Sequence, residues 1–74
     1  MDYTLYTIDG CLRCFSVKKI LENNEILYIE KNVLHDVEAR SELIRLVDEV
    51  IAPVLINTKN GEVLKWDQLQ STFI

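Results

Sequence analysis

Cys11 and Cys14 are the only cysteines of the chain, and two residues, Leu12 and Arg13, separate them. They follow an apolar stretch and open a segment with helical periodicity, which places them in the first turn of a helix. Thiols three residues apart in a first turn share one face of the helix and can close into a disulfide. A helix N-terminus also lowers the pKa of a thiol, from about 8.5 to roughly 3.5–7.5. The pair therefore predicts thiol–disulfide exchange.

The two cysteines are expected to play different roles. Cys11 falls at or next to the N-cap of the predicted helix, and Arg13 adds a positive charge close by. Cys14 lies one turn further along, on the apolar face, where we expect it to be more buried and less acidic. Cys11 is then the nucleophile that forms a mixed disulfide with a substrate. Cys14 is the resolving thiol, which attacks Cys11 and releases the reduced substrate.

A structural disulfide and a metal site are the alternatives to redox chemistry. A disulfide that stabilises a fold gains from closing a long loop, and this loop is minimal. Zinc normally takes four ligands, and the other good candidate, His35, is remote in the sequence, so the prediction for the single chain is no metal site. A zinc or iron–sulfur site shared by two chains remains an alternative, because a dimer supplies four thiolates. A non-catalytic binding module is the other alternative.

Size and charge narrow the class of protein. The 74 residues predict a single domain, 1–74, and 49% hydrophobic residues suffice for a compact core. A net charge of −4 without a basic stripe disfavours nucleic-acid binding. No apolar run is long enough to span a membrane, and the first residues lack the features of a signal peptide. We therefore expect a cytoplasmic monomer, where closely spaced cysteines are typically redox-active or metal-binding.

The apolar pattern predicts seven elements and an α/β fold. Strands are expected at residues 3–8, 26–33, 54–57 and 62–66, with a hairpin turn at Asn60-Gly61. Helices are expected at 11–23 and 36–50, and Asp67 is expected to cap a short last helix. The order β-α-β-α-β-β-α predicts a four-stranded mixed sheet flanked by helices. The buried stripe of the second helix is predicted to contain Ala39, Leu43, Leu46, Val47 and Val50.

Pro53 is the only proline, and it directly precedes the predicted strand 54–57. It either stops the preceding helix and starts the strand, or forms a cis-proline turn that faces the cysteines. A cis bond is a minority state for proline, so Pro53 alone does not justify it. Its combination with the cysteine pair favours the second interpretation.

These features together resemble the glutaredoxin family of the thioredoxin superfamily, over nearly the whole chain. The resemblance consists of the first strand, Cys11-Leu12-Arg13-Cys14 at the start of a helix, Ile51-Ala52-Pro53, the hairpin, and Asp67 before the last helix. It implies a thioredoxin-like fold, a cis Pro53 and disulfide reduction without a tightly bound cofactor. It also implies that the backbone of Ala52 pairs with an extended substrate or with glutathione.

The glutathione groove matches the family less well than the cysteine pair does. Leu64-Lys65 stands where glutaredoxins have Gly-Gly, and Ile8 stands where they often have a basic residue. The bulk at Leu64-Lys65 either crowds the groove or supplies Lys65 as a new carboxylate partner. Trp66 either lines the groove or packs the last helix, and Asp67 is placed to orient the α-amino group of glutathione. The predicted groove residues are Arg13, Ala52, Pro53, Lys65, Trp66 and Asp67.

The resemblance also implies partners. The protein would carry electrons to a protein disulfide, with ribonucleotide reductase as a reasonable substrate, and would itself be reduced by glutathione or by thioredoxin reductase. Lys18 and Lys19, one to two turns beyond the cysteines, are interpreted as a solvated helix face, with contact to an acidic partner or to a glutathione carboxylate as the alternative.

Overall fold

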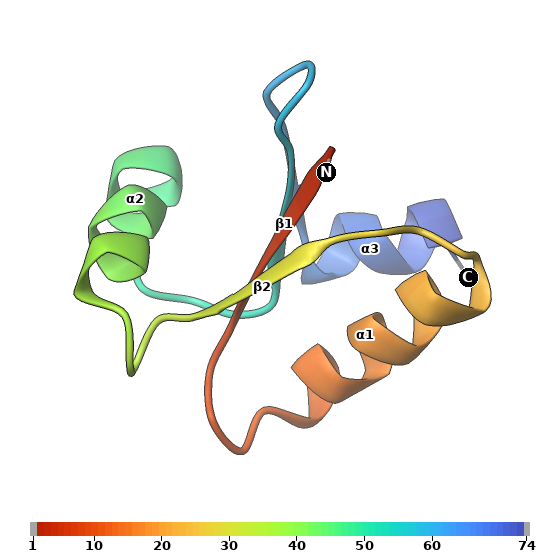
Figure 1. The fold of residues 1–74 in the computed structure, drawn as a ribbon, viewed down its shortest axis with the longest axis horizontal. Helices are drawn as coiled ribbons and strands as arrows, with labels where there is room; N and C mark the ends of the chain where they lie inside the picture. The colour runs from red at the N-terminus through yellow and green to blue at the C-terminus, as the bar shows by residue number, and fades with distance from the viewer. Residues whose placement is uncertain (1, 74) are drawn as a thin grey trace.

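The computed structural model describes residues 2–73, and its element order is the one that the sequence predicts (Figure 1). It contains three helices and four short strands, and the last two strands follow one another directly. The elements are β1 (Tyr3–Thr7), α1 (Leu12–Asn23), β2 (Ile29–Asn32), α2 (Val37–Val47), β3 (Val54–Asn57), β4 (Glu62–Lys65) and α3 (Trp66–Phe73).

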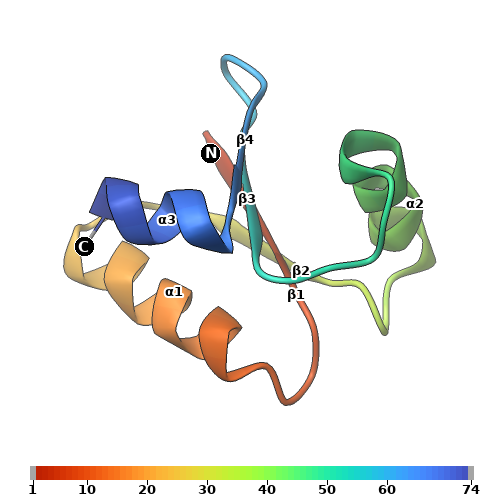
Figure 2. The ribbon, with the colours of Figure 1, turned by 180° about the vertical axis from the view of Figure 1, so that it is seen from behind.

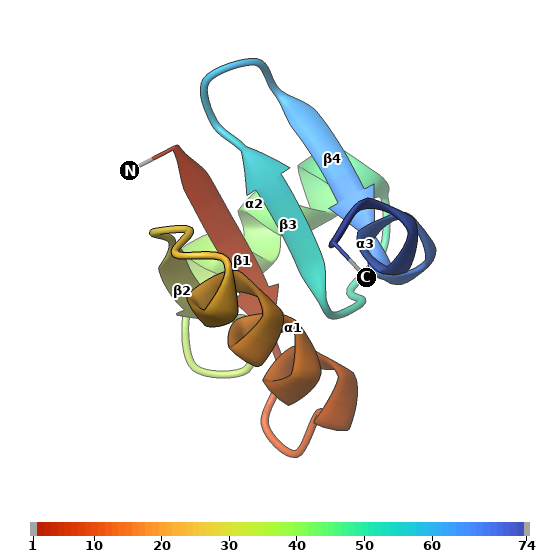
Figure 3. The same ribbon diagram turned by 90° about the vertical axis from the view of Figure 1, so that its right-hand side faces the viewer.

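The four strands form one mixed sheet in the order β2-β1-β3-β4. β1 pairs with β2 in parallel, and the β1–β3 and β3–β4 pairs are antiparallel. Helices cover both faces: α1 and α3 lie side by side on one face, and α2 lies on the other (Figures 2 and 3). This confirms the predicted mixed sheet flanked by helices.

Alternation along the strands divides the core in two. Leu5, Leu55 and Leu64 are register partners across three strands, and all three face α1 and α3. The neighbouring residues Tyr6, Val54 and Ile56 face the opposite way, toward α2. Successive side chains of a strand point to opposite faces, so one sheet supplies both cores. The central strands β1 and β3 are therefore buried on both sides. β1 leads to Cys11, and β3 begins directly after Pro53.

The second strand is shorter than the predicted 26–33, because the chain uses residues 24–26 to end α1. Glu25 adopts a left-handed φ of 58° and donates its N–H to the carbonyl of Glu22 at 3.1 Å. Ile26 donates its N–H to the carbonyl of Leu21 at 2.9 Å. These two bonds form a Schellman motif, which satisfies carbonyls at the end of the helix. Pairing with β1 begins only at Ile29, and Leu27 is exposed.

The predicted helix 36–50 was too long. Ala39, Leu43 and Val47 are buried as expected, and Asp36 caps the start by accepting from the N–H of Ala39 at 3.1 Å. The helix ends at Val47, because Asp48 turns into the left-handed region with a φ of 62°. The expectation that Leu46 and Val50 are buried was wrong: both are exposed, and Val50 lies beyond the helix end.

The junction before the last helix also differs from the prediction. The fourth strand ends at Lys65 rather than at Trp66, which is the first residue of α3. Asp67 lies inside the first turn of α3 and is not its cap. Gln68 does the capping instead, since its Oε1 accepts the N–H of Lys65 at 2.8 Å. This is the backward half of a capping box, in which a side chain at the third helical position reaches back to the N-cap N–H.

The Schellman motif of α1 gives a test of the fold. Glu25→Gly should raise the free energy of unfolding by about 0.5–1 kcal/mol, because glycine adopts the left-handed region without the steric cost of a side chain. Chemical denaturation measures the change. Asn24→Gly is the matched control: Asn24 has a φ of −95° and donates its side-chain N–H to the carbonyl of Ile20, so this change should lower stability. A loss of stability in Glu25→Gly would contradict the assigned backbone conformation.

Candidate active site

A tight turn between β1 and α1 places the first cysteine. Gly10 adopts a φ of 73°, in the left-handed region that favours glycine, and the N–H of Cys11 donates to the carbonyl of Ile8 at 3.2 Å. The chain then enters α1 with Cys11 as the N-cap residue, as the sequence predicts. The active-site motif is therefore attached to the end of β1, a central strand of the sheet.

Cys11 and Cys14 form a disulfide, with their Cα atoms 5.2 Å apart. Cys11 is half-buried, whereas Cys14 is only 2% exposed, which confirms the predicted difference in burial. The backbone N–H of Cys14 donates to Sγ of Cys11 at 3.0 Å. A hydrogen bond from a helix N-terminus stabilises negative charge on the sulfur that receives it. The geometry thus favours Cys11 as the sulfur that carries the thiolate after the disulfide opens.

Pro53 is brought to the cysteines by the pairing of the two central strands. Tyr6 of β1 lies opposite Val54 of β3, so the residue before Val54 lies beside the end of β1 that leads to Cys11. The Ala52–Pro53 peptide bond is cis, which confirms what the family resemblance implies. Pro53 is buried and Ala52 is half-buried.

A surface pocket of about 330 Å³ opens beside the disulfide. Both cysteines line it, and Thr7, Lys18 and Glu30 contribute side chains from three different elements. Leu12 and Phe15, which are 82% and 57% exposed, form an apolar part of its lining. The remaining lining residues are Ile8, Asp9, Gly10 and Asn32.

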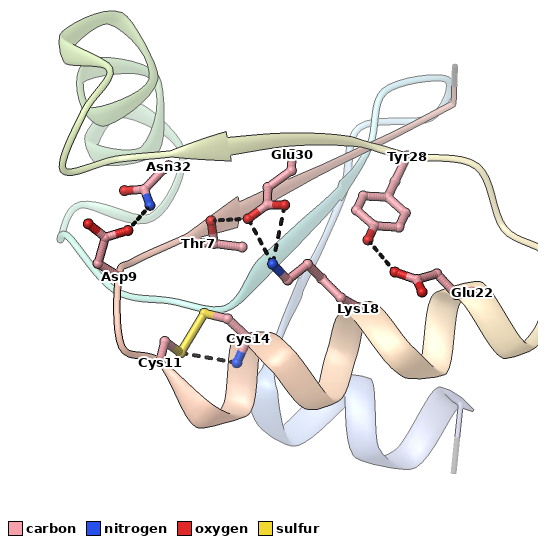
Figure 4. A network of polar contacts seen from close by, with 9 residues as sticks. All are labelled: Thr7, Asp9, Cys11, Cys14, Lys18, Glu22, Tyr28, Glu30 and Asn32. Atoms are coloured by element: carbon pink, nitrogen blue, oxygen red, sulfur yellow. Dashed lines mark hydrogen bonds and ion pairs between the residues drawn. A yellow bond between two sulfur atoms is a disulfide. The ribbon is translucent and has the colours of Figure 1, made fainter.

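Polar side chains connect α1, β1 and β2 along this pocket (Figure 4). The ammonium of Lys18 pairs with Glu30 at 3.2 Å, and the hydroxyl of Thr7 donates to the same carboxylate at 2.9 Å. The signal for this group was present in the sequence: Lys18 lies four residues after Cys14, which is one helical turn. Sequence reasoning treated Lys18 as solvated and missed Thr7 and Glu30, because the register between β1 and β2 is needed to bring them together.

A second cluster of polar side chains lies at the loop that leads from β1 to Cys11. The carboxylate of Asp9 accepts from the side chain of Asn32 at 2.6 Å and contacts the ring of His35. These hydrogen bonds, that of His35 first and that of Asn32 second, lower the pKa of Asp9. Asp9 therefore keeps its negative charge, and its carboxylate points toward Asn32 and away from the disulfide (Figure 4).

The structure separates the predicted groove residues into different surroundings. The guanidinium of Arg13 lies over the ring of Trp66, 5.3 Å from its centroid, and so connects the start of α1 to the start of α3. Lys65 and Asp67 line a different hollow of about 540 Å³, next to the end of α2. Leu64 is buried in the core, so its bulk does not project into either hollow.

Residues 2–73 contain neither a cluster of metal ligands nor a membrane-spanning helix. No group of three or more His, Cys, Asp or Glu side chains among them is arranged to hold a metal ion. No helix within the same range is long and apolar enough to cross a membrane.

Comparisons with known proteins support these observations. The family model described as Glutaredoxin matches residues 3–63. Comparison with curated protein sequences gives no significant match. Among solved structures, the thioredoxin-like protein BC3987 is 30% identical with a TM-score of 0.80, and the match covers 93% of this chain and 96% of that chain.

A second solved structure is similar over almost its whole length. NrdH-redoxin from Escherichia coli, described as a glutaredoxin-like protein with a thioredoxin-like activity profile, is 25% identical with a TM-score of 0.73. That match covers 97% of this chain and 95% of that chain. With a family model that spans most of its length and a Cys-x-x-Cys disulfide at the N-terminus of α1, the chain belongs to the glutaredoxin family, whose general activity is thiol–disulfide oxidoreduction.

Proposed function

We propose that this protein reduces disulfides of other proteins, with Cys11 as the nucleophile and Cys14 as the resolving thiol. The observation that carries the proposal is the hydrogen bond from the N–H of Cys14 to Sγ of Cys11, at the N-terminus of α1. This hydrogen bond supports Cys11 as the sulfur that carries the thiolate, and Cys11 is also the more accessible of the two.

The reaction proceeds in two exchanges. The Cys11 thiolate attacks one sulfur of the substrate disulfide, forms a mixed disulfide and displaces the other substrate sulfur as a thiolate. The Cys14 thiol then loses its proton to solvent, attacks Sγ of Cys11 and displaces the second substrate sulfur. The substrate has gained two electrons and two protons, and the protein holds the Cys11–Cys14 disulfide.

A protein substrate fits the surface around the cysteines. Leu12 and Phe15 expose apolar area directly beside the disulfide, which suits an apolar segment of a partner. The half-buried Ala52 precedes the cis proline, where its backbone would pair with an extended segment of the substrate. Among protein disulfides, that of ribonucleotide reductase is the substrate that we propose to test first.

We also propose that thioredoxin reductase, rather than glutathione, reduces the oxidised protein. The N–H of Lys65, at the start of α3, is already bonded to Gln68, and the Arg13–Trp66 contact bridges the starts of α1 and α3. Both features reduce the polar surface offered to glutathione there. The thioredoxin-like activity profile described for NrdH-redoxin, which is similar over nearly the whole chain, supports the same choice.

Two serine variants test the assignment of the cysteines. Cys11→Ser should lower the rate of insulin reduction at least about a hundredfold, because it removes the nucleophile. Cys14→Ser should stop after the first exchange and accumulate a mixed disulfide, which mass spectrometry detects at Cys11. With ribonucleotide reductase as the substrate, the same variant should trap that enzyme. Full activity in Cys11→Ser would sink the assignment.

A comparison of reductants tests the electron source. The oxidised protein should be reduced several times faster by thioredoxin reductase with NADPH than by millimolar glutathione, since the N–H of Lys65 is bonded to Gln68 and Arg13 is engaged with Trp66. Loss of NADPH absorbance and the mass of the alkylated protein follow the two reactions. A glutaredoxin known to accept glutathione serves as the control. Equal or faster reduction by glutathione would contradict this proposal and leave the cysteine assignment standing.

A further inference from the structure

Cys14 faces a charged side chain that the two-cysteine mechanism does not use. Lys18 lies one helical turn after Cys14, and both residues line the same pocket. In the close view, the Lys18 side chain extends along α1 toward the end that carries the disulfide, and its ammonium lies on the Cys14 side of Glu30 (Figure 4). Lys18 is only 31% exposed, so solvent screens its charge incompletely.

Three elements hold this ammonium in place. Both oxygens of the Glu30 carboxylate accept from Lys18, at 3.3 and 3.2 Å, and they anchor it to β2. Glu30 is in turn held by the hydroxyl of Thr7 on β1, a residue that is 2% exposed. Glu30 is the register partner of Leu5, whose side chain packs against α1. The Glu30 side chain therefore lies on the face of the sheet that α1 covers. The position of the positive charge is therefore set by the fold and not by a freely moving side chain.

We propose that Lys18 is a positioning residue for the resolving step, whose ammonium stabilises the thiolate of Cys14. This inference rests on the proposed function, because it concerns the second exchange. A positive charge close to a thiol favours its ionised form. Loss of the Cys14 proton to solvent becomes more favourable, and the thiolate then attacks Cys11 and releases the substrate thiolate. The hydrogen bond to Cys11 assists the first sulfur, and Lys18 assists the second.

The charged groups around the pocket agree with this assignment. Asp9, Lys18 and Glu30 are those that line it. Asp9 is engaged with Asn32 and His35, and the Lys18–Glu30 pair has its positive end, the ammonium, on the Cys14 side (Figure 4). Arg13 lies outside the lining, over the ring of Trp66. Lys18 is thus the positive group that shares the pocket with Cys14.

The chain contains a matched control for this test. Lys31 pairs with Glu42 at 3.0 Å, and Glu42 also accepts from the hydroxyl of Tyr6. Like Lys18, Glu30 and Thr7, these residues form a lysine–glutamate pair with a hydroxyl donor from β1. They lie on the opposite face of the sheet, against α2. Lys31→Met and Lys18→Met each remove one positive charge from an ion pair of similar exposure, so the general effect of losing a charge is common to both.

The first readout is the titration of a single thiol. In a Cys11→Ser background only Cys14 titrates, and the ultraviolet absorbance of its thiolate is followed against pH. Lys18→Met should shift the midpoint upward by about half a pH unit, which is about a threefold loss of thiolate at a fixed pH below it. Lys31→Met should leave the midpoint unchanged, and Lys18→Arg, which keeps the charge, should restore it. Lys18→Gln replaces Lys18→Met if the latter does not fold.

The second readout separates the two exchanges in the two-cysteine protein. An aromatic disulfide with a coloured thiol releases one equivalent when Cys11 attacks and a second when Cys14 resolves. Lys18→Met should slow the second phase about twofold at neutral pH and leave the first unchanged, because the threefold loss of thiolate is partly offset by the greater nucleophilicity of the more basic thiolate. An unchanged second phase and midpoint would overturn the role of Lys18. Absence of the first phase in the unaltered protein would instead overturn the proposed function.

Discussion

The N–H of Cys14 points at the sulfur of Cys11, and the geometry of this one contact depends on most of the fold. The hydrogen bond exists because the chain enters α1 directly at Cys11, and that entry depends on the left-handed turn at Gly10. This turn directly follows β1, a strand that is buried on both faces and paired on both edges. The central strand β1 therefore fixes the position of the N-terminus of α1 and of the positive end of its helix dipole.

The same strands also assemble the rest of the site. The antiparallel pairing of β1 with β3 brings Pro53 beside the cysteine loop, and the parallel pairing with β2 brings Glu30 under α1. Both sulfurs line the pocket that contains Lys18, but Cys11 is half-buried and accepts the backbone N–H of Cys14, whereas Cys14 is 2% exposed. This difference in surroundings agrees with the proposed sequential reaction, in which Cys11 attacks first and Cys14 resolves.

The sequence predicted the elements that rest on strong local patterns and missed those set by distant contacts. The Cys11 N-cap, the Asp36 cap and the alternating core were readable, because each follows from neighbouring residue types. The end of α1 at Asn23 was predicted as well, but the start of β2 and the end of α2 were not, because Glu25 and Asp48 take left-handed conformations that favour glycine. The Lys18–Glu30 contact was missed for another reason: strand register decides it, and register is not visible from the sequence of one strand.

The central claim is that the start of α1 makes Cys11, and not Cys14, the reactive thiol. The most direct measurement is the rate at which iodoacetamide modifies each cysteine of the reduced protein across a range of pH, with the modified site assigned by mass spectrometry. The account predicts that Cys11 is modified first. As the pH rises, its rate of modification should reach a plateau at a pH below the ordinary thiol pKa of about 8.5. Preferential modification of Cys14, or equal rates that rise together through that range, would contradict it.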